Sequence, residues 1–477
     1  MRRAKIVATL GPATASAEAV LELVTAGMDV ARLNLSHGDY ADHLDACKWV
    51  RQASDESGRS VAILVDLQGP KIRLGRFSSG PVELIVGKEF IVTTEECPGD
   101  AHMVSTTFIG LPGDVSPGDM VLVDDGRVEL QVTKIVGPRV HTVVIDGGIV
   151  SNNKGFNLPG VAVSVPSLSE KDREDLRWGL RNGADLIALS FVRSSADIHD
   201  VHAIMDEEGV RLPVLAKVEK PQAVDNIEDI IAAFDGVMVA RGDLGVELPL
   251  EMVPLVQKRA VQMCREAGKP VIVATQMLDS MITESRPTRA EVSDVANAVL
   301  DGADALMLSG ETSVGARPSH AVSTMSTIIE HLEEEALDRI PALQDSPTGS
   351  TARALTHAAV DVANGTGSTH LIAFTETGRS ARLIARWRAR TPLLAFTPNP
   401  RVRSQLSLTW GVETFLVPQV SHTDDMVTQV DKALLDIGRA SAGERVVIVA
   451  GVPPGVPGTT NGMRVHKMGT AGRGGGV

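Results

Sequence analysis

A lysine and two carboxylates stand at the ends of two successive apolar runs. Residues 214–218 are apolar except for Lys217, and Glu219 follows directly. Residues two apart in a strand point to the same side, so Lys217 and Glu219 are expected to share a face. The next apolar run, residues 236–240, leads into Arg241, Gly242 and Asp243.

These residue types suit one kind of chemistry if the two runs are adjacent parallel strands. Carboxylate oxygens are the ligands that Mg²⁺ prefers, and the ion usually shares them with phosphate oxygens. An ammonium group beside them can neutralise charge that develops on a moving phosphoryl group. The stretch therefore indicates magnesium-assisted phosphoryl transfer. The alternative is that the same side chains form ordinary surface ion pairs at strand ends.

Eight short apolar runs supply the strands that must position this chemistry. They lie at residues 5–10, 30–35, 61–67, 186–191, 214–218, 237–240, 271–275 and 305–308. Near-continuous apolar strands alternating with helical patterns are typical of a parallel sheet covered on both faces. Eight such units predict an α/β fold built on a closed (β/α)₈ barrel, or TIM barrel.

Polar side chains end most of these apolar runs at their downstream ends. They are Arg32, Asn34, Ser36, Asp66, Ser190, Lys217, Glu219, Asp243, Thr275 and Glu311. Active sites of such barrels form at the carboxyl ends of the strands. We therefore expect these side chains to meet around the mouth of the barrel.

Two further domains are expected. Residues 74–163 contain short alternating strands separated by Gly, Pro and Asp-Gly turns, which predicts an antiparallel β-barrel domain inserted into a barrel of residues 1–73 and 164–340. This insertion leaves after the third strand and returns before the fourth, so it is expected to cover the active site as a lid. Its return segment carries Lys154.

The C-terminal domain is predicted to span residues 341–477, after a stretch rich in Pro, Ser and Gly. Apolar runs at 371–375, 393–396, 414–417 and 446–450 predict an open α/β sheet. Small hydroxyls, a glycine and an arginine follow the first run and form a candidate phosphate-binding turn. Its residues are Thr375, Thr377, Gly378, Arg379 and Ser380. A plain strand-to-helix turn is the alternative interpretation.

Composition limits the partners. The net charge of −14 and an aromatic content of 3% disfavour a nucleic-acid partner, which needs basic surfaces and stacking side chains. No apolar run approaches the ~20 residues that cross a bilayer, so no membrane association is expected. Three widely spaced cysteines argue against a disulfide framework or zinc site. A cytoplasmic location is expected.

Seven segments, in this order and spacing, closely resemble pyruvate kinase. They read ARLNLSHG, LVDLQGPKIR, AKVEK, MVARGDLG, ATQML, RPTRAEVSDVANAVLDGAD and MLSGET. The resemblance covers nearly the whole chain, including the inserted β-domain and the C-terminal domain. It implies transfer of the phosphoryl group of phosphoenolpyruvate to ADP, giving pyruvate and ATP, which is the last step of glycolysis.

The resemblance also implies roles for the residues of the barrel mouth. Glu219 and Asp243 match the Mg²⁺ ligands of the family, with Mn²⁺ as an alternative ion. Lys217 matches the lysine that stabilises the transferring phosphoryl group, and Arg32 matches the residue that holds the substrate phosphate.

Thr275 and the backbone amides of Gly242 and Asp243 match the group that holds the substrate carboxylate in the family. Further matching residues face the nucleotide, and the last two of them are expected on the ADP phosphates. They are Asn34, Ser36, His37, Arg73 and Lys154.

One departure from the family pattern concerns potassium. Many members bind K⁺ through residues that match Asn34, Ser36, Asp66 and Leu67, with a glutamate where this chain has Lys71. An ammonium group can supply the same single positive charge at that position. We therefore expect catalysis here to be independent of K⁺.

A second departure concerns regulation by a phosphorylated small molecule. Family members activated by fructose 1,6-bisphosphate typically have a lysine at the position of Glu376 and a tryptophan-arginine pair in a late loop, which here reads Gly-Val-Pro-Pro-Gly at residues 451–455. A monophosphate effector, such as a hexose phosphate or AMP, is therefore expected. The family is generally tetrameric, which implies a homotetramer.

Two other functions compete with this interpretation. One is a barrel enzyme of the aldolase or mutase type that binds phosphoenolpyruvate or pyruvate over Mg²⁺. The other is a non-catalytic sugar-phosphate sensor that uses the C-terminal domain. The first needs no nucleotide residues, and the second leaves Lys217, Glu219, Asp243 and Thr275 without a purpose.

Overall fold

Eight parallel strands form a closed barrel at the centre of the molecule. The structure is a computed structural model that describes residues 2–124, 126–161, 163–343 and 349–471. Around the barrel the order is β1-β16-β15-β14-β13-β12-β3-β2. The strands are β1 (Lys5–Thr9), β2 (Val30–Asn34), β3 (Ala62–Asp66), β12 (Leu186–Leu189), β13 (Val214–Val218), β14 (Gly236–Ala240), β15 (Val271–Ala274) and β16 (Ala305–Leu308). The predicted fold class is confirmed.

Apolar residues fill both faces of these strands. Alternate residues, such as Leu215 on β13 and Met238 on β14, join one cluster that fills the barrel interior. Their neighbours, such as Val214 and Val237, join the larger cluster beneath the surrounding helices. Burial on both faces explains why the strands read as continuous apolar runs.

Some helices of the barrel begin and end at the residues that helix capping favours. Ser16 accepts a hydrogen bond from the amide of Ala19 at the start of α1, and Gly27 ends that helix with a φ of +127°. The helices are α1 (Ala17–Ala26), α2 (Tyr40–Ser57), α4 (Glu170–Arg181), α5 (Ile198–Glu207), α6 (Pro221–Asp225), α7 (Ile227–Ala233), α8 (Arg241–Glu247), α9 (Val253–Ala267), α10 (Arg289–Asp301), α11 (Gly310–Ser313) and α12 (Pro318–Ala336).

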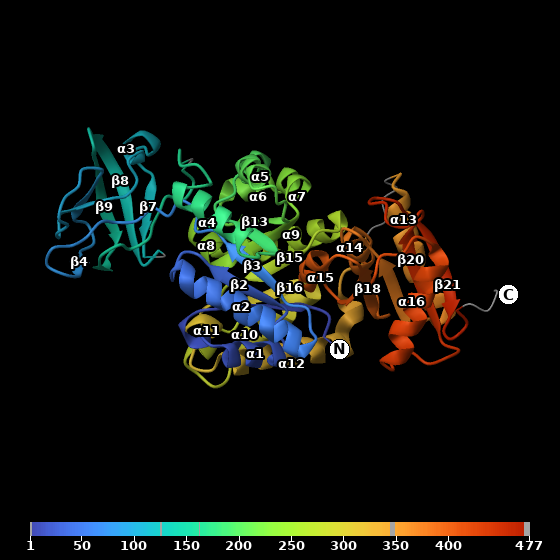
Figure 1. The fold of residues 1–477 in the computed structure, drawn as a ribbon. Coiled ribbons are helices and arrows are strands. Elements are labelled where there is room, and N and C mark those ends of the chain that lie inside the picture. The colour runs from blue at the N-terminus through green and yellow to red at the C-terminus, as the bar shows by residue number, and fades with distance from the viewer. Residues whose placement is uncertain (1, 125, 162, 344–348, 472–477) are drawn as a thin grey trace.

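The inserted segment forms a separate β-rich body at one end of the molecule (Figure 1). Its elements are β4 (Val82–Leu84), β5 (Glu89–Thr93), β6 (Met103–Ser105), α3 (Leu111–Asp114), β7 (Met120–Val123), β8 (Val128–Val136), β9 (Arg139–Asp146), β10 (Gly148–Val150) and β11 (Phe156–Asn157). Six strands form a sheet in the order β11-β7-β8-β9-β5-β6, and β10 pairs with β4. Pairing is antiparallel except between β5 and β6. A core of its own fills this body.

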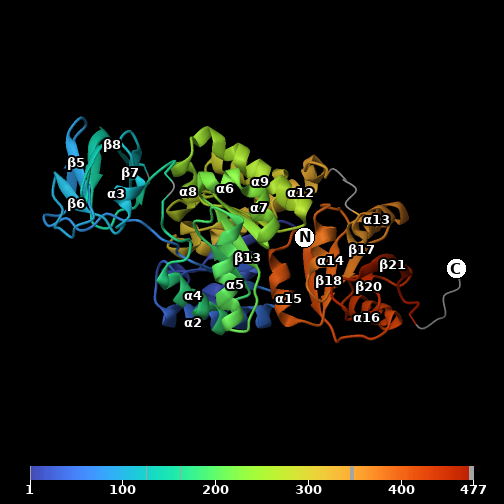
Figure 2. The same ribbon diagram turned by 90° about the horizontal axis from the view of Figure 1, so that it is seen from above.

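The C-terminal α/β sheet lies at the opposite end of the molecule, against the barrel (Figure 2). Its elements are α13 (Thr351–Thr366), β17 (His370–Phe374), α14 (Arg379–Ala385), β18 (Leu393–Thr397), α15 (Pro400–Gln405), β19 (Val412–Leu416), α16 (Thr423–Asp436), β20 (Arg445–Gly451) and β21 (Thr460–Lys467). The strand order is β19-β18-β17-β20-β21, and β21 is antiparallel. The sequence did not predict β21.

Residues 344–348 of the expected domain boundary lie outside the described residues. Within the ranges that the structure describes, no helix is long and apolar enough to cross a membrane.

Candidate active site

Lys217 lies at the centre of a buried group of polar side chains at the carboxyl ends of the barrel strands. Its Nζ is 2.8 Å from Glu219 Oε1 and 3.3 Å from Asp66 Oδ1, and it donates to Ser190 Oγ at 2.7 Å. These residues come from β13, from β3 and from the end of β12. They meet because β12 pairs with both β3 and β13 in parallel.

The charged side chains of this group shift one another's pKa values in different directions. Burial alone would lower the pKa of the Lys217 ammonium, but the carboxylates of Asp66, Glu219 and Asp243 raise it above its usual value. The pKa of Asp66 is lowered, because Lys217 and Arg32 outweigh the effect of burial. The pKa of Glu219 is raised by burial and by Asp243 in spite of Lys217. Burial is the largest of these causes, and it outweighs the attraction between the Glu219 carboxylate and the Lys217 ammonium.

Asp243 completes the acidic side of the group from the next strand. The pairing of β13 with β14 brings Lys217 opposite Met238 and Val218 opposite Val239, so Glu219 and Asp243 emerge from neighbouring strand ends. The Asp243 carboxylate is exposed, whereas that of Glu219 is buried. Two carboxylates of this kind fit a divalent cation such as Mg²⁺, which keeps several water or phosphate ligands.

A cavity of about 200 Å³ opens beside Asp243, between the barrel and the inserted domain. Basic residues line it on both sides, among them Lys71, Arg73, Arg193 and Lys220. An anionic ligand with several phosphates suits such a cavity, because the cations offset the repulsion from the carboxylates.

Thr275 follows β15 with a strained backbone. Its φ is +71° and that of Gln276 is +53°, a region that residues with side chains rarely adopt. Strain of this kind often accompanies a functional site. Thr275 Oγ1 accepts a hydrogen bond from the Gly242 amide at 2.7 Å and donates to the Ala274 carbonyl at 2.6 Å. The turn thus presents Thr275 beside the first turn of α8.

Arg241 stabilises this strained turn by hydrogen bonds to its backbone. Its guanidinium donates to the Thr275 carbonyl at 2.7 Å and lies 2.7 Å from Asp294 Oδ1 on α10. A weaker contact of 3.3 Å reaches the Ala274 carbonyl. Sequence reasoning missed Arg241 as a contributor to the site. The ion-pair partner lies 53 residues further along the chain, so no local pattern reveals it.

Arg32 is almost completely buried and lies against Asp66. Its Nε is 2.7 Å from Asp66 Oδ2, and Nη1 donates to Thr9 Oγ1 at 3.0 Å. The ion pair fixes the guanidinium at the barrel mouth, and Lys217 approaches the other oxygen of the same Asp66 carboxylate, Oδ1. Next to it, Asn34 Oδ1 accepts from the Ser36 amide at 3.3 Å.

His37 is exposed above this group, within a positive field. Burial lowers the pKa of its imidazole, and Lys71, Arg73 and Arg32 lower it further. The predicted residues Arg32, His37, Lys71 and Arg73 are therefore gathered on one side of the mouth. Leu67 is buried below them, and its carbonyl accepts from Ser190 Oγ at 2.7 Å.

Models of two protein families match the chain. The description "Pyruvate kinase, barrel domain" matches residues 1–322, and "Pyruvate kinase, alpha/beta domain" matches residues 353–466. The chain belongs to the pyruvate kinase family. It is therefore an enzyme, a phosphotransferase of glycolysis, and the family implies phosphoenolpyruvate and ADP as substrates. Pyruvate kinases generally use Mg²⁺.

Relatives match along the whole chain. A pyruvate kinase of Mycobacterium intracellulare is 59% identical, over 98% of this chain and 99% of that protein. One from Corynebacterium glutamicum is 57% identical, over 98% of both chains. A crystal structure of a pyruvate kinase from Cryptosporidium parvum superimposes with a TM-score of 0.90 at 35% identity, covering 98% of this chain and 96% of that one.

Lys154, expected on the nucleotide phosphates, lies elsewhere in this conformation of the pyruvate kinase fold. Its Nζ pairs with Asp124 at 2.8 Å inside the inserted domain. Arg73 donates to the backbone carbonyl of the neighbouring residue, Asn153, at 3.1 Å. The structure therefore brings Arg73, but not the Lys154 ammonium, to the cavity beside Asp243.

Two lysines outside the predicted site are fixed near it. Lys220 lies 2.6 Å from Glu247 and 5.0 Å from the centre of the Phe191 ring, and it lines the same cavity as Asp243. Lys171 is the second of these lysines. It is half exposed, but it donates to the Leu35 carbonyl and pairs with buried Asp175 at 2.5 Å.

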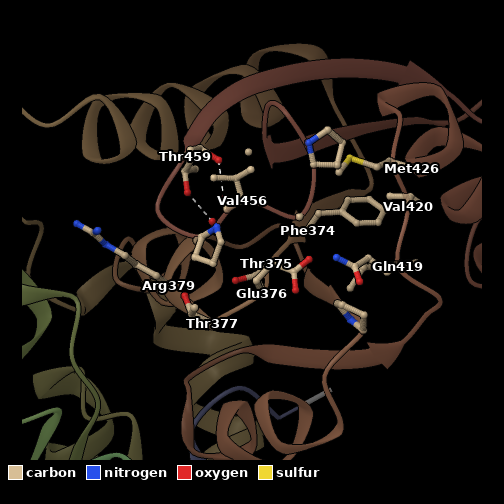
Figure 3. A pocket seen from close by; sticks show the side chains of 18 of the residues that line it. Phe374, Thr375, Glu376, Thr377, Arg379, Gln419, Val420, Met426, Val456 and Thr459 are labelled. Atoms are coloured by element: carbon tan, nitrogen blue, oxygen red, sulfur yellow. Dashed lines mark hydrogen bonds between the residues drawn. The ribbon is translucent and has the colours of Figure 1, made fainter.

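The candidate phosphate-binding turn of the C-terminal domain faces a small cavity of about 50 Å³ (Figure 3). Thr375 Oγ1 accepts from the Gly378 amide at 2.9 Å, and Gly378 has a φ of +80°. Ser380 and Thr460 share a hydrogen bond of 2.7 Å. Glu376 and the loop at residues 454–460 line the cavity.

Proposed function

We propose that the chain transfers the phosphoryl group of phosphoenolpyruvate to ADP at the site built around Lys217, Glu219 and Asp243. The observation that carries this proposal is the position of the Lys217 ammonium, buried between Glu219 and Asp66 at the barrel mouth. A fixed cation there stabilises charge on a phosphoryl group in transit. Family membership supplies the substrates.

The proposed metal ligands are Glu219 and Asp243. Burial and the nearby charge of Asp243 raise the pKa of Glu219, so a divalent cation held by the two carboxylates would favour their charged forms. Mg²⁺ or Mn²⁺ held by these oxygens supplies positive charge to the phosphate groups when it is bound. Most of its remaining ligands come from water and substrate, because only two carboxylates are offered.

The proposed substrate contacts lie on either side of this pair. Arg32 holds the phosphate of phosphoenolpyruvate, with Asp66 fixing its guanidinium. Thr275 and the amides of Gly242 and Asp243 hold the substrate carboxylate. In this structure the Gly242 amide donates to Thr275 Oγ1, so a bound carboxylate exchanges with that bond.

The nucleotide is proposed to lie between the barrel and the inserted domain. Asn34, Ser36 and His37 contact it from the barrel, and Arg73 reaches the phosphates at the cavity beside Asp243. Lys154 joins them after the inserted domain, residues 74–163, closes as a lid. For its ammonium to reach the nucleotide phosphates, Lys154 must leave Asp124, with which it forms a partly buried ion pair.

Two regulatory features complete the proposal. Lys71 takes the part of a monovalent cation near Asn34, Ser36, Asp66 and Leu67, so that turnover does not need K⁺. A phosphorylated effector binds the turn that contains Thr375, Thr377, Gly378, Arg379 and Ser380, and the functional assembly in the cytoplasm is a homotetramer.

One assay separates this proposal from the competing barrel enzymes. Phosphoenolpyruvate, Mg²⁺ and enzyme are incubated with and without ADP, and pyruvate and ATP are both measured. Phosphoryl transfer predicts equal amounts of pyruvate and ATP and no consumption of phosphoenolpyruvate without ADP. A mutase consumes it without ADP, an aldolase consumes it only when an aldehyde is added and forms no ATP, and a sensor does not consume it at all.

A further inference from the structure

A second cavity lies at the opposite side of the barrel, where the C-terminal domain packs against it. The barrel wall is formed before the starts of β13, β14 and β15, by residues such as Pro213, Asp235 and Pro270. The other wall comes from Arg353 near the start of α13, from α14 and from α15; Figures 1 and 2 show α14 and α15 at this junction. The volume is about 310 Å³, which is in the range of small-molecule sites.

Three arginines of the C-terminal domain line this cavity. They are Arg353, Arg379 and Arg382. Among the residues that the structure describes, none of the three forms an ion pair with a carboxylate. Arg353 donates to the carbonyls of Glu266 at 2.9 Å and Ala267 at 3.4 Å, and Arg382 donates to that of Thr377 at 3.1 Å. Carbonyls satisfy the N–H groups but do not neutralise the charge.

The charge of Arg382 is poorly compensated. Burial lowers the pKa of its guanidinium, and Arg379 lowers it further, while Asp235 opposes this only in part. Arg382 is only partly buried, and an anion bound in the cavity would add counter-charge that favours its cationic form.

A smaller neighbouring cavity adds to the positive charge. It shares Lys269 and Arg382 with the first and is also lined by Arg265 and Arg388. Arg388 pairs with Asp304 at 3.0 Å. Arg265 is 2% exposed, and its Nε has no hydrogen-bond partner among the described residues. Burial and Arg388 lower its pKa to about 9. Basic residues are thus concentrated at this junction, although the net charge of the chain is −14.

The remaining polar groups of the cavity suit hydroxyls rather than a second anion. Asp235 lines it, and its carboxylate also accepts from the Val214 amide at 2.9 Å. Gln405 contributes an amide. The Lys269 ammonium donates to the backbone carbonyls of Ile231, Ala232 and Phe234, at 2.6 to 2.8 Å, so its charge is held in a fixed position.

We propose that this junction is a second small-molecule site, which takes the phosphate monoester of a polyol. The phosphate lies against Arg353 and Arg382, and hydroxyl groups face Asp235 and Gln405. The site is distinct from the turn that begins at Thr375, with which it shares only Arg379. Figure 3 shows the Arg379 side chain pointing away from Glu376 and Thr377.

The site has a mechanical consequence. A ligand held there contacts the C-terminal domain through its phosphate and the barrel through its hydroxyls. Binding therefore favours the packed arrangement of the two domains, since a ligand stabilises the state to which it binds.

Tungstate, a heavy phosphate analogue, locates the site directly in crystals of the full-length enzyme. We expect an anomalous peak within hydrogen-bonding distance of both Arg353 and Arg382. The peak is expected to persist in Ser380→Ala, which alters the neighbouring turn, and to disappear in Arg353→Gln. A peak confined to the 375–380 turn, or a junction peak that survives Arg353→Gln, overturns the proposal.

Calorimetry with sorbitol 6-phosphate tests the ligand class in solution, in the Ser380→Ala background. Arg353→Gln and Arg382→Gln are each expected to weaken binding at least ten-fold, while Arg401→Gln, an exposed arginine, leaves it unchanged. Sorbitol alone is expected not to bind. Equal weakening by all three variants, or equal binding of sorbitol, contradicts the assignment. Thermal melting without ligand confirms folding, and the second arginine variant serves if the first is unfolded.

Discussion

The Lys217 ammonium lies 2.8 Å from the Glu219 carboxylate, on the same face of β13, and both side chains are nearly inaccessible to solvent. Asp66 approaches the same ammonium to 3.3 Å from β3. The Lys217 ammonium thus contacts two buried carboxylates. A third carboxylate, that of Asp243, lies near enough to raise the pKa of Lys217 further. The group is acidic overall, which leaves room for a divalent ion.

Replacing Lys217 tests its role in catalysis. Lys217→Met removes the fixed cation, so kcat should fall by ~10²–10³ or more, the loss found when a single electrostatic stabiliser is deleted. The matched control is Lys48→Met, because Lys48 is an exposed lysine with a carboxylate partner at 2.7 Å. Circular dichroism checks the fold. A folded Lys217→Met enzyme with unchanged kcat would place the chemistry at another site.

Arg241 is expected to act as a positioning residue for Thr275. Arg241→Gln removes the donor to the Thr275 carbonyl, so the strained turn relaxes and kcat/KM for phosphoenolpyruvate falls ~10²-fold, the effect of a misplacement of about 1 Å. The KM for ADP should not change, and Arg241→Lys should restore part of the activity. Arg259→Gln, at an exposed arginine, is the control. A uniform loss for both substrates would indicate a general structural role.

Potassium dependence tests the proposed role of Lys71. Turnover in buffer free of K⁺ and Na⁺, with tetramethylammonium as the salt, should stay within a few-fold of the rate in K⁺. Lys71→Glu should make turnover depend on K⁺, because it replaces the single positive charge by a carboxylate that attracts the ion. A rate for the unchanged enzyme that collapses by orders of magnitude without K⁺ rejects the proposal.

Effector preference tests the proposed role of Glu376. Fructose 1,6-bisphosphate should bind weakly, because Glu376 lines the cavity beside the phosphate-binding turn and repels a second phosphate. Glu376→Lys should bind the bisphosphate at least ten-fold more tightly, whereas Glu334→Lys, at an exposed glutamate on α12, should not. Calorimetry measures both. Tight bisphosphate binding by the unchanged enzyme, with no monophosphate binding, contradicts the proposal.

The barrel could be predicted from the sequence because each of its strands is buried on both faces. Such a strand, for example β13 with Val214 and Leu215 on opposite faces, leaves an unbroken apolar run that is easy to find. The edge strand β21 leaves no such trace. Its residues Thr460–Lys467 are mostly exposed, and it forms only because it pairs with β20.

In the active site, too, local sequence patterns predicted some features and missed those that depend on distant contacts. Lys217 and Glu219 were accessible to sequence reasoning, because strand periodicity alone places them on one face. The support of Thr275 was not, because it depends on a positive φ and on the distant pair of Arg241 with Asp294. The position of Lys154 depends on its pair with Asp124, 30 residues earlier in the chain, which local sequence does not determine.

The position of a bound Mn²⁺ ion tests the central claim most directly. A crystal of the enzyme soaked with Mn²⁺ and phosphoenolpyruvate should give one anomalous peak about 2.2 Å from carboxylate oxygens of both Glu219 and Asp243, with the substrate phosphate beside Lys217. Glu219→Gln should weaken or abolish that peak. An ion bound at another place, or an ion that contacts neither carboxylate, would contradict the assignment of this group as the site of phosphoryl transfer.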